Sequence, residues 1–342
     1  MRALQLVADR RVEPVDIPPP PPPGRGEATV AIQAVALNHI DVWGWRGMAF
    51  AKRNMPLVVG AEACGVIEAL GDGVSGLEVG QLVAIYGART CGHCKACLQR
   101  RDNLCENVEG VHGFHLDGFA QERMNVLARQ LVPAPEGCDA TSAAVTPITF
   151  GTVEHMLFDN AKLEAGETVL VHAGGSGIGT AAIQLAKLAG ATVITTVGSD
   201  AKIEPARALG ADHVINYRED RFEGVVRKLT GKKGVDVVFE HVGADTWAGS
   251  MLSMKKGGRL VTCGSTSGVS ASMNLMQLFQ QQLRIIGSFG CRIDNMATVM
   301  DKLATGKVRP VIDSEIGFDN LGDALARLES RNVFGKILLR IA

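Results

Sequence analysis

The spacing of apolar residues along the chain changes about 140 residues from its start. Up to about residue 130, short strand-like runs are separated by glycines and show no helical period, as in ATVAIQAVAL (28–37) and CGVIEALG (64–71). After about residue 140, near-continuous apolar runs such as ETVLVHA (167–173) alternate with helical stretches such as TAAIQLAKLAG (180–190). The first pattern predicts a domain rich in β-strands. The second predicts βαβ units whose parallel sheet is buried on both faces.

These patterns predict an α/β protein with more than one domain. A chain of 342 residues is too long for one simple core, so two domains are expected. We expect the β-rich domain over residues 1–130 and the parallel-sheet domain over residues 131–309. The remaining segment, about 310–342, ends in the strand-like KILLRIA and could extend the parallel sheet or return to the first domain.

The charge balance does not predict a charged macromolecular partner. With 35 basic and 36 acidic residues the net charge is -1, which favours neither a nucleic acid nor an anionic membrane surface. No run of about 18 consecutive apolar residues predicts a membrane span. Charges are spread through the first residues, where a signal peptide would need an apolar core. We therefore expect a cytoplasmic protein that acts on a small molecule.

A glycine-rich segment follows the first strand of the parallel pattern and opens a helix. In VLVHAGGSGIGTAAIQ, glycines stand at 174, 175, 177 and 179. Glycines in such a turn let the backbone approach a diphosphate, and the helix N-terminus adds partial positive charge. The strand–turn–helix context favours a dinucleotide site over a plain Gly-rich turn. The residues expected to bind the cofactor here are Gly174, Gly175, Ser176, Gly177 and Ile178.

The end of the next strand bears on which dinucleotide binds. An NAD site usually has an acidic residue there, about 20 residues on, to bind the ribose hydroxyls, but this chain has Val197 and Gly198. The missing acid and the nearby cations favour the 2′-phosphate of NADPH. Asp200 lies past the strand end and is interpreted as a cap of the following helix. The expected contacts are Ser199, Lys202, Tyr217 and Arg218; the alternative for the lysine and the arginine is a solvated surface charge.

Four of the eight cysteines form a C-x2-C-x2-C-x7-C array at Cys91, Cys94, Cys97 and Cys105. In a reducing compartment, such clustering favours metal ligation over disulfides. Four thiolates close a zinc tetrahedron and leave no position for a substrate, so the array predicts a structural zinc site. The alternative is a metal-free loop with four free thiols. His93, inside the array, is expected to face solvent.

The chain resembles the zinc-type, medium-chain alcohol dehydrogenase and quinone reductase superfamily. The resemblance rests on GVIEALGDGVSGLEVGQLV (65–83), the cysteine array, the glycine loop and VFGKILL (333–339), and it covers nearly the whole chain. It implies a GroES-like catalytic domain, completed by about 310–342, and a doubly wound Rossmann domain. It also implies that Thr149 packs against the nicotinamide. Family members commonly dimerise through the segment that matches LRIIGSFG (283–290), so a homodimer or homotetramer is expected.

The same resemblance points to a catalytic zinc site whose ligands this sequence lacks. Family members place a Cys, a His and a third ligand where this chain has Asn38, Ala61 and Val145. Alanine and valine cannot bind zinc, so no catalytic zinc is expected. The alternative is an unusual ligand set drawn from His39, Glu62, Cys64 and His155.

Without that zinc, an alcohol loses the metal that would stabilise its alkoxide, whereas reduction of an activated alkene or quinone needs only one or two hydrogen-bond donors. ALNHIDVW (36–43) resembles the zinc-free quinone reductases. This implies that Asn38 lies beside the nicotinamide and the substrate carbonyl. Asp41 would orient that end of the cleft, unless it caps a helix. Some enoyl reductases of the superfamily use a Tyr acid that is missing here, which leaves His39, Tyr86 or water as the proton donor.

The sequence therefore predicts an NADPH-dependent reductase of quinones, enones or enoyl compounds that carries one structural zinc. The alternatives are a zinc-dependent alcohol dehydrogenase or aldehyde reductase, and a nucleotide-binding protein without turnover. The residues expected to shape the substrate pocket are mostly generic apolar and aromatic choices, which favour no single substrate: Trp43, Trp45, Met48, Phe50 and Met273.

Overall fold

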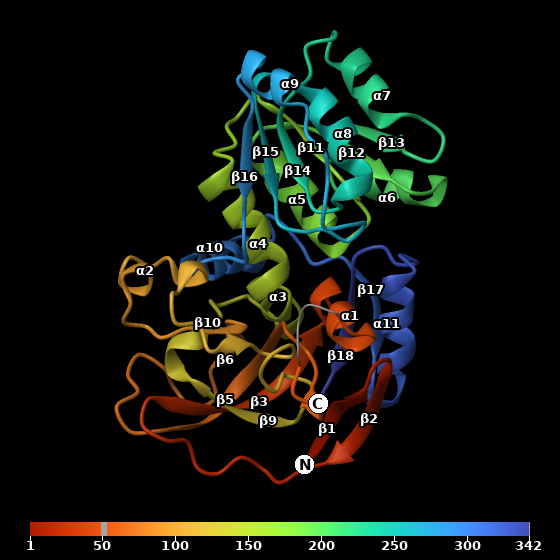
Figure 1. Ribbon diagram of the computed structural model, residues 1–342. Helices are drawn as coiled ribbons and strands as arrows, with labels where there is room; N and C mark the ends of the chain where they lie inside the picture. Colours follow the sequence, from red (N-terminus) through yellow and green to blue (C-terminus); the bar gives the residue numbers. More distant parts are fainter. Residues whose placement is uncertain (49–52, 342) are drawn as a thin grey trace. The chain divides into compact units, whose positions relative to one another are not determined.

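The computed structural model describes residues 1–48 and 53–341, and its contacts divide the chain into two compact units (Figure 1). Unit 1 comprises Met1–Gly151 and Cys291–Ala342, and unit 2 comprises Thr152–Gly290. Among the residues described, no helix is long and apolar enough to cross a bilayer.

Unit 1 is built on a sheet of seven strands in which segments from both ends of the chain are neighbours. Its main path runs β10-β6-β5-β3-β18-β17, with β9 also paired to β3. All of these pairs are antiparallel except β17 with β18. The strands are β3 (Glu27–Ala36), β5 (Ala63–Leu70), β6 (Leu82–Ile85), β9 (Arg123–Leu127), β10 (Leu131–Pro133), β17 (Ile312–Ile316) and β18 (Lys336–Arg340).

Smaller elements complete unit 1. A three-stranded sheet consists of β2 (Arg11–Asp16), β1 (Arg2–Ala8) and β4 (Leu57–Val58), and β7 (Ala88–Arg89) pairs with β8 (Gly110–Val111). The helices are α1 (His39–Arg46), α2 (Lys95–Leu98), α3 (Ala140–Ala144), α10 (Ile293–Ala304) and α11 (Leu321–Glu329). The apolar alternation of the strands fills one core, with Ile32, Ile67 and Phe119 among its fully buried side chains.

Unit 2 is a parallel sheet of six strands in the order β13-β12-β11-β14-β15-β16. Numbered within the unit this is 3-2-1-4-5-6, the order of the Rossmann fold. The strands are β11 (Thr168–Val171), β12 (Thr192–Val197), β13 (His213–Asn216), β14 (Val235–Glu240), β15 (Met254–Thr262) and β16 (Arg284–Gly287). The helices are α5 (Gly177–Leu188), α6 (Ile203–Ala208), α7 (Phe222–Leu229), α8 (Ala244–Ser253) and α9 (Leu275–Gln280), and α4 (Gly151–Glu154) begins at the last residue of the first segment of unit 1. The continuous apolar runs are buried on both faces, as in β14, where all six residues are buried.

The contact boundaries differ from those expected at 130/131 and 309/310. Residues 131–151 belong to unit 1 because β10 pairs with β6 and α3 packs on β3 and β5. Residues 291–309 join them because α10 packs on α3 and β10. The buried side chains of Tyr86, Val132 and Met296 share one cluster there. Pairing and packing between distant segments set these boundaries, and the local apolar pattern does not contain that information.

Candidate functional site

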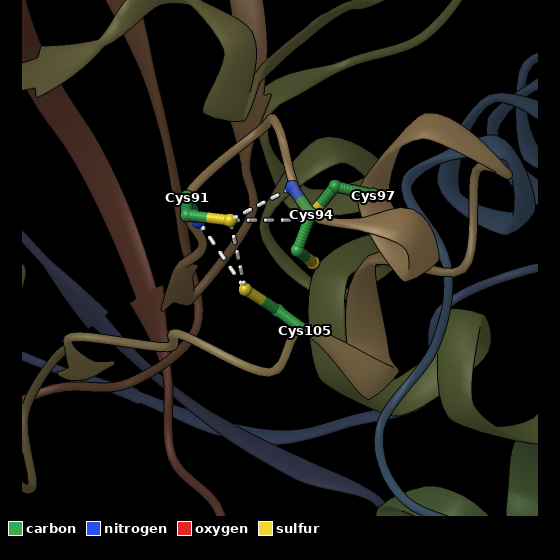
Figure 2. Close-up of side chains that lie close together, drawn as sticks. All are labelled: Cys91, Cys94, Cys97 and Cys105. Carbon is green, nitrogen blue, oxygen red and sulfur yellow. Dashed lines mark hydrogen bonds between the residues drawn. The ribbon is translucent and has the colours of Figure 1, made fainter.

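The four cysteines of the array converge in unit 1 (Figure 2). Cys94 caps the short helix α2, and Cys97 lies in that helix one turn later. Cys91 precedes it, and Cys105 follows a 3-10 turn at Asp102–Leu104. The backbone N–H groups of Cys91 and Cys94 donate to the sulfurs of Cys105 and Cys91, both at 3.3 Å.

The sulfur positions fit a tetrahedral metal. Cys91 Sγ lies 4.0 Å from Cys97 Sγ and 3.6 Å from Cys105 Sγ, and all four sulfurs lie within 4.8 Å of one another. Four sulfurs bound to zinc at about 2.3 Å would lie about 3.8 Å apart. Backbone hydrogen bonds, the strongest from His93, lower the pKa of the Cys91 thiol to about 6, whereas burial raises the pKa of the Cys97 thiol to about 12. The His93 side chain is exposed and bonds only the Cys91 carbonyl oxygen among the contacts described.

The glycine loop joins β11 to α5 in unit 2. Ser176 is the N-cap of α5, and its hydroxyl accepts a hydrogen bond from the N–H of Gly179 at 2.9 Å. At this helix start, the N–H groups of Gly177 and Ile178 have no intrahelical acceptor and suit an anion. A Cβ on Gly174 would lie 2.3 Å from Thr195 Oγ1, and one on Gly179 would lie 2.2 Å from the Ala173 carbonyl oxygen. The tight approach of loop and strand therefore requires glycine at both positions.

The expected ribose contacts gather at the carboxyl ends of β12 and β13, which are parallel neighbours. Val197 pairs with Asn216, so Ser199 and Tyr217 follow the two strand ends side by side. A Cβ on Gly198 would lie 2.6 Å from the Tyr217 hydroxyl oxygen. Arg218 is exposed and Lys202 is half-buried.

The interpretation of Asp200 as a helix cap is wrong. Ser199 is the N-cap of the 3-10 turn Asp200–Lys202, and Asp200 is its first residue. The Asp200 carboxylate instead accepts a hydrogen bond from Asn216 Nδ2 at 2.9 Å, which ties the two strand ends together.

Three buried polar residues of unit 1 surround the half-buried Asn38, and we call the four the Glu62 cluster: Asn38, Glu62, Thr149 and Lys336. Strand register creates it. Leu338 of β18 pairs with Ala36 of β3, which brings Lys336 level with Asn38 on one side of that strand. On the other side, the N–H of Ala36 donates to the carbonyl oxygen of Glu62.

The Glu62 carboxylate is completely buried and accepts five hydrogen bonds. Its Oε1 accepts from the backbone N–H groups of Ile148 and Thr149, at 2.7 and 2.6 Å. These groups lie in the first turn of a π-helix, Thr146–Phe150, where they lack an intrahelical acceptor. Its Oε2 accepts from Thr149 Oγ1, Asn38 Nδ2 and Lys336 Nζ at 2.8, 2.9 and 3.1 Å. These hydrogen bonds offset the free-energy cost of burying a carboxylate.

The Asn38 side chain is fully engaged within unit 1. Its Nδ2 donates to the Ala36 carbonyl oxygen and to Glu62, both at 2.9 Å. Its Oδ1 accepts from Lys336 Nζ at 2.8 Å. A side-chain amide has two N–H donors, so both are in use. The predicted place of Asn38 beside a substrate carbonyl stays a prediction, but as arranged here the residue offers no free N–H donor.

Asp41 is the third residue of α1, and its partners are those of a structural cap. Its carboxylate accepts from the N–H of Asn38 at 2.7 Å and from the N–H of Ala61 at 3.1 Å. Burial raises the pKa of this carboxyl to about 6, against the opposing effect of the two backbone hydrogen bonds and of Lys336. This geometry favours the helix-cap interpretation over a direct catalytic role. His39 begins α1 and is half-buried.

Known protein families and solved structures share this architecture. Two family models match, "Alcohol dehydrogenase GroES-like domain" over residues 24–136 and "Zinc-binding dehydrogenase" over residues 177–305. A solved structure described as an NAD-dependent alcohol dehydrogenase is 37% identical, with a TM-score of 0.94 over 100% of both chains. The chain belongs to the medium-chain dehydrogenase/reductase superfamily. It is an oxidoreductase of that superfamily, which confirms the predicted fold class and family.

Two curated relatives have names that specify a reaction. The acryloyl-coenzyme A reductase of Metallosphaera sedula is 30% identical over 317 residues, and the match covers 92% of each chain. The acryloyl-coenzyme A reductase of Sulfurisphaera tokodaii is 26% identical over 341 residues, which is 99% of this chain and 100% of the relative.

Two residues of the unusual zinc ligand set, Cys64 and His155, have partners of their own within their units. Cys64 Sγ donates to the Ala140 carbonyl oxygen, and burial raises its pKa to about 12. His155 belongs to unit 2, where its Nδ1 lies 2.8 Å from Asp159. Within residues 1–48 and 53–341, the four cysteines of the array form the only cluster with metal-ligating spacing.

The structure shows the surroundings of one expected proton donor, Tyr86, and of two expected pocket residues, Trp45 and Met273. Tyr86 donates its hydroxyl hydrogen to the Cys291 carbonyl oxygen at 2.8 Å, and burial raises its pKa well above the usual value, so it is a poor acid. Trp45 is buried under the Arg10 guanidinium, and Met273 is an exposed residue of unit 2. Phe50 lies outside the described residues.

The sequence patterns do not mark Lys336 as a functional candidate. The VFGKILL segment contributes only to the family resemblance, and Glu62 is marked only as part of an alternative zinc ligand set. A basic residue between a glycine and an apolar strand is the one local signal for Lys336, and its partners lie 274 and 298 residues away.

Proposed function

We propose that this protein is a nicotinamide-dependent reductase of electron-poor acceptors, namely α,β-unsaturated carbonyl compounds, including enoyl thioesters, or quinones. One observation carries the proposal. Asn38, Ala61 and Val145 stand at the positions where zinc-type relatives have catalytic zinc ligands, whereas the glycine loop is intact. The names of the two acryloyl-coenzyme A reductases support the same class of acceptor.

The chemistry follows from which substrates need a metal. An alcohol reacts as its alkoxide, which a bound metal stabilises strongly. A conjugated acceptor is already electrophilic, and its carbonyl oxygen takes up the arriving charge, so a few hydrogen-bond donors suffice. The Asn38 amide, the alanine and the valine would not hold a catalytic zinc, so the acceptor class fits the residues.

The cofactor site would use the glycine loop and the neighbouring strand ends. The N–H groups at the start of α5 and the capped turn at Ser176 suit the diphosphate. The bound dinucleotide would supply a hydride. We propose NADPH because Val197 and Gly198 replace the acid that binds ribose hydroxyls, with Ser199, Lys202, Tyr217 and Arg218 nearby. The relative described as NAD-dependent makes NADH the necessary comparison.

We further propose that the cysteine array holds one structural zinc. The sulfur spacing and the chemistry of four thiolates support this assignment. Such a site lacks an open position and would stabilise the loop from Cys91 to Cys105 rather than take part in the reaction.

The test measures oxidation of NADPH and of NADH with quinones, enones, enoyl-CoA esters and aldehydes. The proposal predicts turnover with a conjugated acceptor, no turnover with aldehydes and no loss of activity with a chelator that leaves the protein folded. Aldehyde turnover that a chelator abolishes would instead support a zinc alcohol dehydrogenase. Cofactor binding without turnover of any acceptor would support a protein that binds nucleotides without catalysis.

A further inference from the structure

Lys336 is a buried cation that the proposed mechanism has not used. Its side chain is 5% exposed, and its partner Glu62 is 0% exposed. Lysine is almost never buried unless it is paired, since its ammonium loses strong hydration. Its position is fixed by the strand it begins, because β18 pairs with β3.

Lys336 differs from Asn38 and Glu62 in how many of its N–H donors have an acceptor. Both N–H donors of Asn38 are engaged, and every described partner of the Glu62 carboxylate is a donor. An ammonium has three N–H donors. Two of them go to Asn38 Oδ1 and Glu62 Oε2, and the third has no partner in the part of the chain that the structure describes.

The location of this donor is informative. The resemblance to zinc-type dehydrogenases implies that Asn38 replaces a catalytic zinc ligand, and Lys336 Nζ lies 2.8 Å from its Oδ1. A positive charge therefore lies beside one of the residues that would otherwise surround a metal. Glu62 and Asn38 hold the ammonium by their oxygens through two of its three N–H groups.

We propose that Lys336 is a catalytic residue that donates this third hydrogen bond to the carbonyl oxygen of the acceptor, as a substitute for a metal cation. This inference rests on the proposed reductase function. The β-carbon receives a hydride with its electron pair, which the dinucleotide would give up from a C–H bond on being oxidised, and the C=C π pair shifts toward the carbonyl as the acceptor is reduced. The negative charge develops on the oxygen, where the ammonium stabilises it without giving up its proton. A proton from solvent then adds to the α-carbon.

The competing interpretation is a purely structural ion pair that neutralises Glu62. The two differ in what happens when both charges are removed together. Truncating Lys336 alone would leave a buried, unpaired carboxylate and could unfold the protein. The informative variant is therefore Lys336→Met combined with Glu62→Gln, which removes the ammonium without leaving an isolated charge.

The experiment compares the Lys336→Met/Glu62→Gln double variant with the Glu62→Gln single variant. The readouts are kcat at saturating cofactor and acceptor, cofactor Kd and the melting temperature of the cofactor-free protein. We expect the added lysine change to lower kcat by about 10²–10³-fold, the loss seen when one oxyanion donor is removed, with cofactor Kd unchanged. Lys336→Arg should recover part of the loss, since it keeps the cation. The exposed lysine Lys307 of unit 1 supplies the control Lys307→Met, which should leave kcat within about twofold.

Three results would overturn the inference. A folded double variant whose kcat stays within about threefold of the single variant would make the pair structural. A raised cofactor Kd with unchanged kcat would make Lys336 a cofactor ligand. If the unmodified protein reduces none of the conjugated acceptors, the proposed reductase function is wrong, and this inference is wrong with it. If the unmodified protein is active and only the expected loss in the double variant is missing, the inference about Lys336 alone is wrong.

Discussion

His172 lies at the end of β11 and is completely buried between hydroxyl groups. Its Nε2 lies 2.8 Å from Ser250 Oγ, and its Nδ1 lies 3.2 Å from Thr196 Oγ1. Because Ser250 donates its own hydrogen to Glu240, its oxygen is free to accept from the imidazole. These partners define a neutral ring with its proton on Nε2. Burial lowers the pKa of His172 to about 4.

The stability of unit 2 should therefore fall in acid. The unfolded ring titrates near 6.5, so between about pH 6.5 and 4 the unfolded state binds the extra proton and is favoured. The difference in pKa corresponds to about 3 kcal/mol of unfolding free energy, present above pH 6.5 and lost as the pH falls. Urea denaturation followed by circular dichroism at pH 4.5 and pH 7 measures it.

His172→Gln should remove most of this pH dependence, while it lowers stability at pH 7. The exposed His213 provides the control His213→Gln, which should leave the difference between the two pH values unchanged. A His172→Gln protein with the same acid sensitivity as the unmodified chain would contradict the assignment.

At the scale of elements, the cysteine loop is short and poor in apolar contacts. The helix α2 has four residues, of which only Cys97 is buried. A loop of this kind is expected to gain its order from a bound metal rather than from a core.

Cys105→Ser should remove the metal and loosen this loop. Metal analysis is expected to give about one zinc per chain before the change and almost none after it. Limited proteolysis between residues 91 and 105 should become faster. Cys138→Ser is the matched control, because Cys138 is a half-buried thiol outside the array and should leave the zinc content unchanged. Equal zinc content in both variants would rule out the four-cysteine site.

The edge strand β16 is the element proposed to join subunits. In the described sheet it pairs with β15 alone, and Ile285 and Ile286 are only half-buried. An edge strand with open backbone groups can pair with a second copy, and a charge on it blocks such pairing. Ile286→Lys should shift the mass measured by light scattering from an oligomer toward a monomer. Leu188→Lys on α5, at an exposed apolar position away from β16, should not.

The cysteine array and the glycine loop could be predicted from the sequence because each is a local motif of about 15 residues or fewer. The Glu62 cluster could not, because Glu62 and Lys336 meet only through two strands that flank β3. Val145 and Thr149 lie where the chain passes from α3 into a π-helix. The apolar pattern does not predict this change of helix type. Asp41 illustrates the same limit, since Ala61, which supplies one of its two donors, belongs to another loop.

At the scale of the whole molecule, unit 2 is one continuous segment whereas unit 1 is made of two. We expect residues 152–290 expressed alone to fold, and residues 1–151 alone to fail, because β17, β18 and Lys336 are missing. Gly151 and Cys291 are neighbours, since a Cβ on the glycine would lie 2.8 Å from the cysteine sulfur. A protein that joins 1–151 to 291–342 through a short glycine linker should therefore recover the unit 1 fold. Circular dichroism and NMR dispersion distinguish the three cases.

The placement of β18 against β3 also constrains how the chain folds during synthesis. Lys336 leaves the ribosome 274 residues after Glu62, which at typical rates of ~5–20 residues per second is a delay of roughly 14–55 seconds. During that interval the Glu62 carboxylate lacks its cation, and β3 lacks its partner strand β18. Unit 2, whose last residue precedes Lys336, can fold meanwhile. The first domain in the sequence is thus the last to be completed, and it exposes unpaired strand edges to chaperones for as long as the ribosome takes to finish.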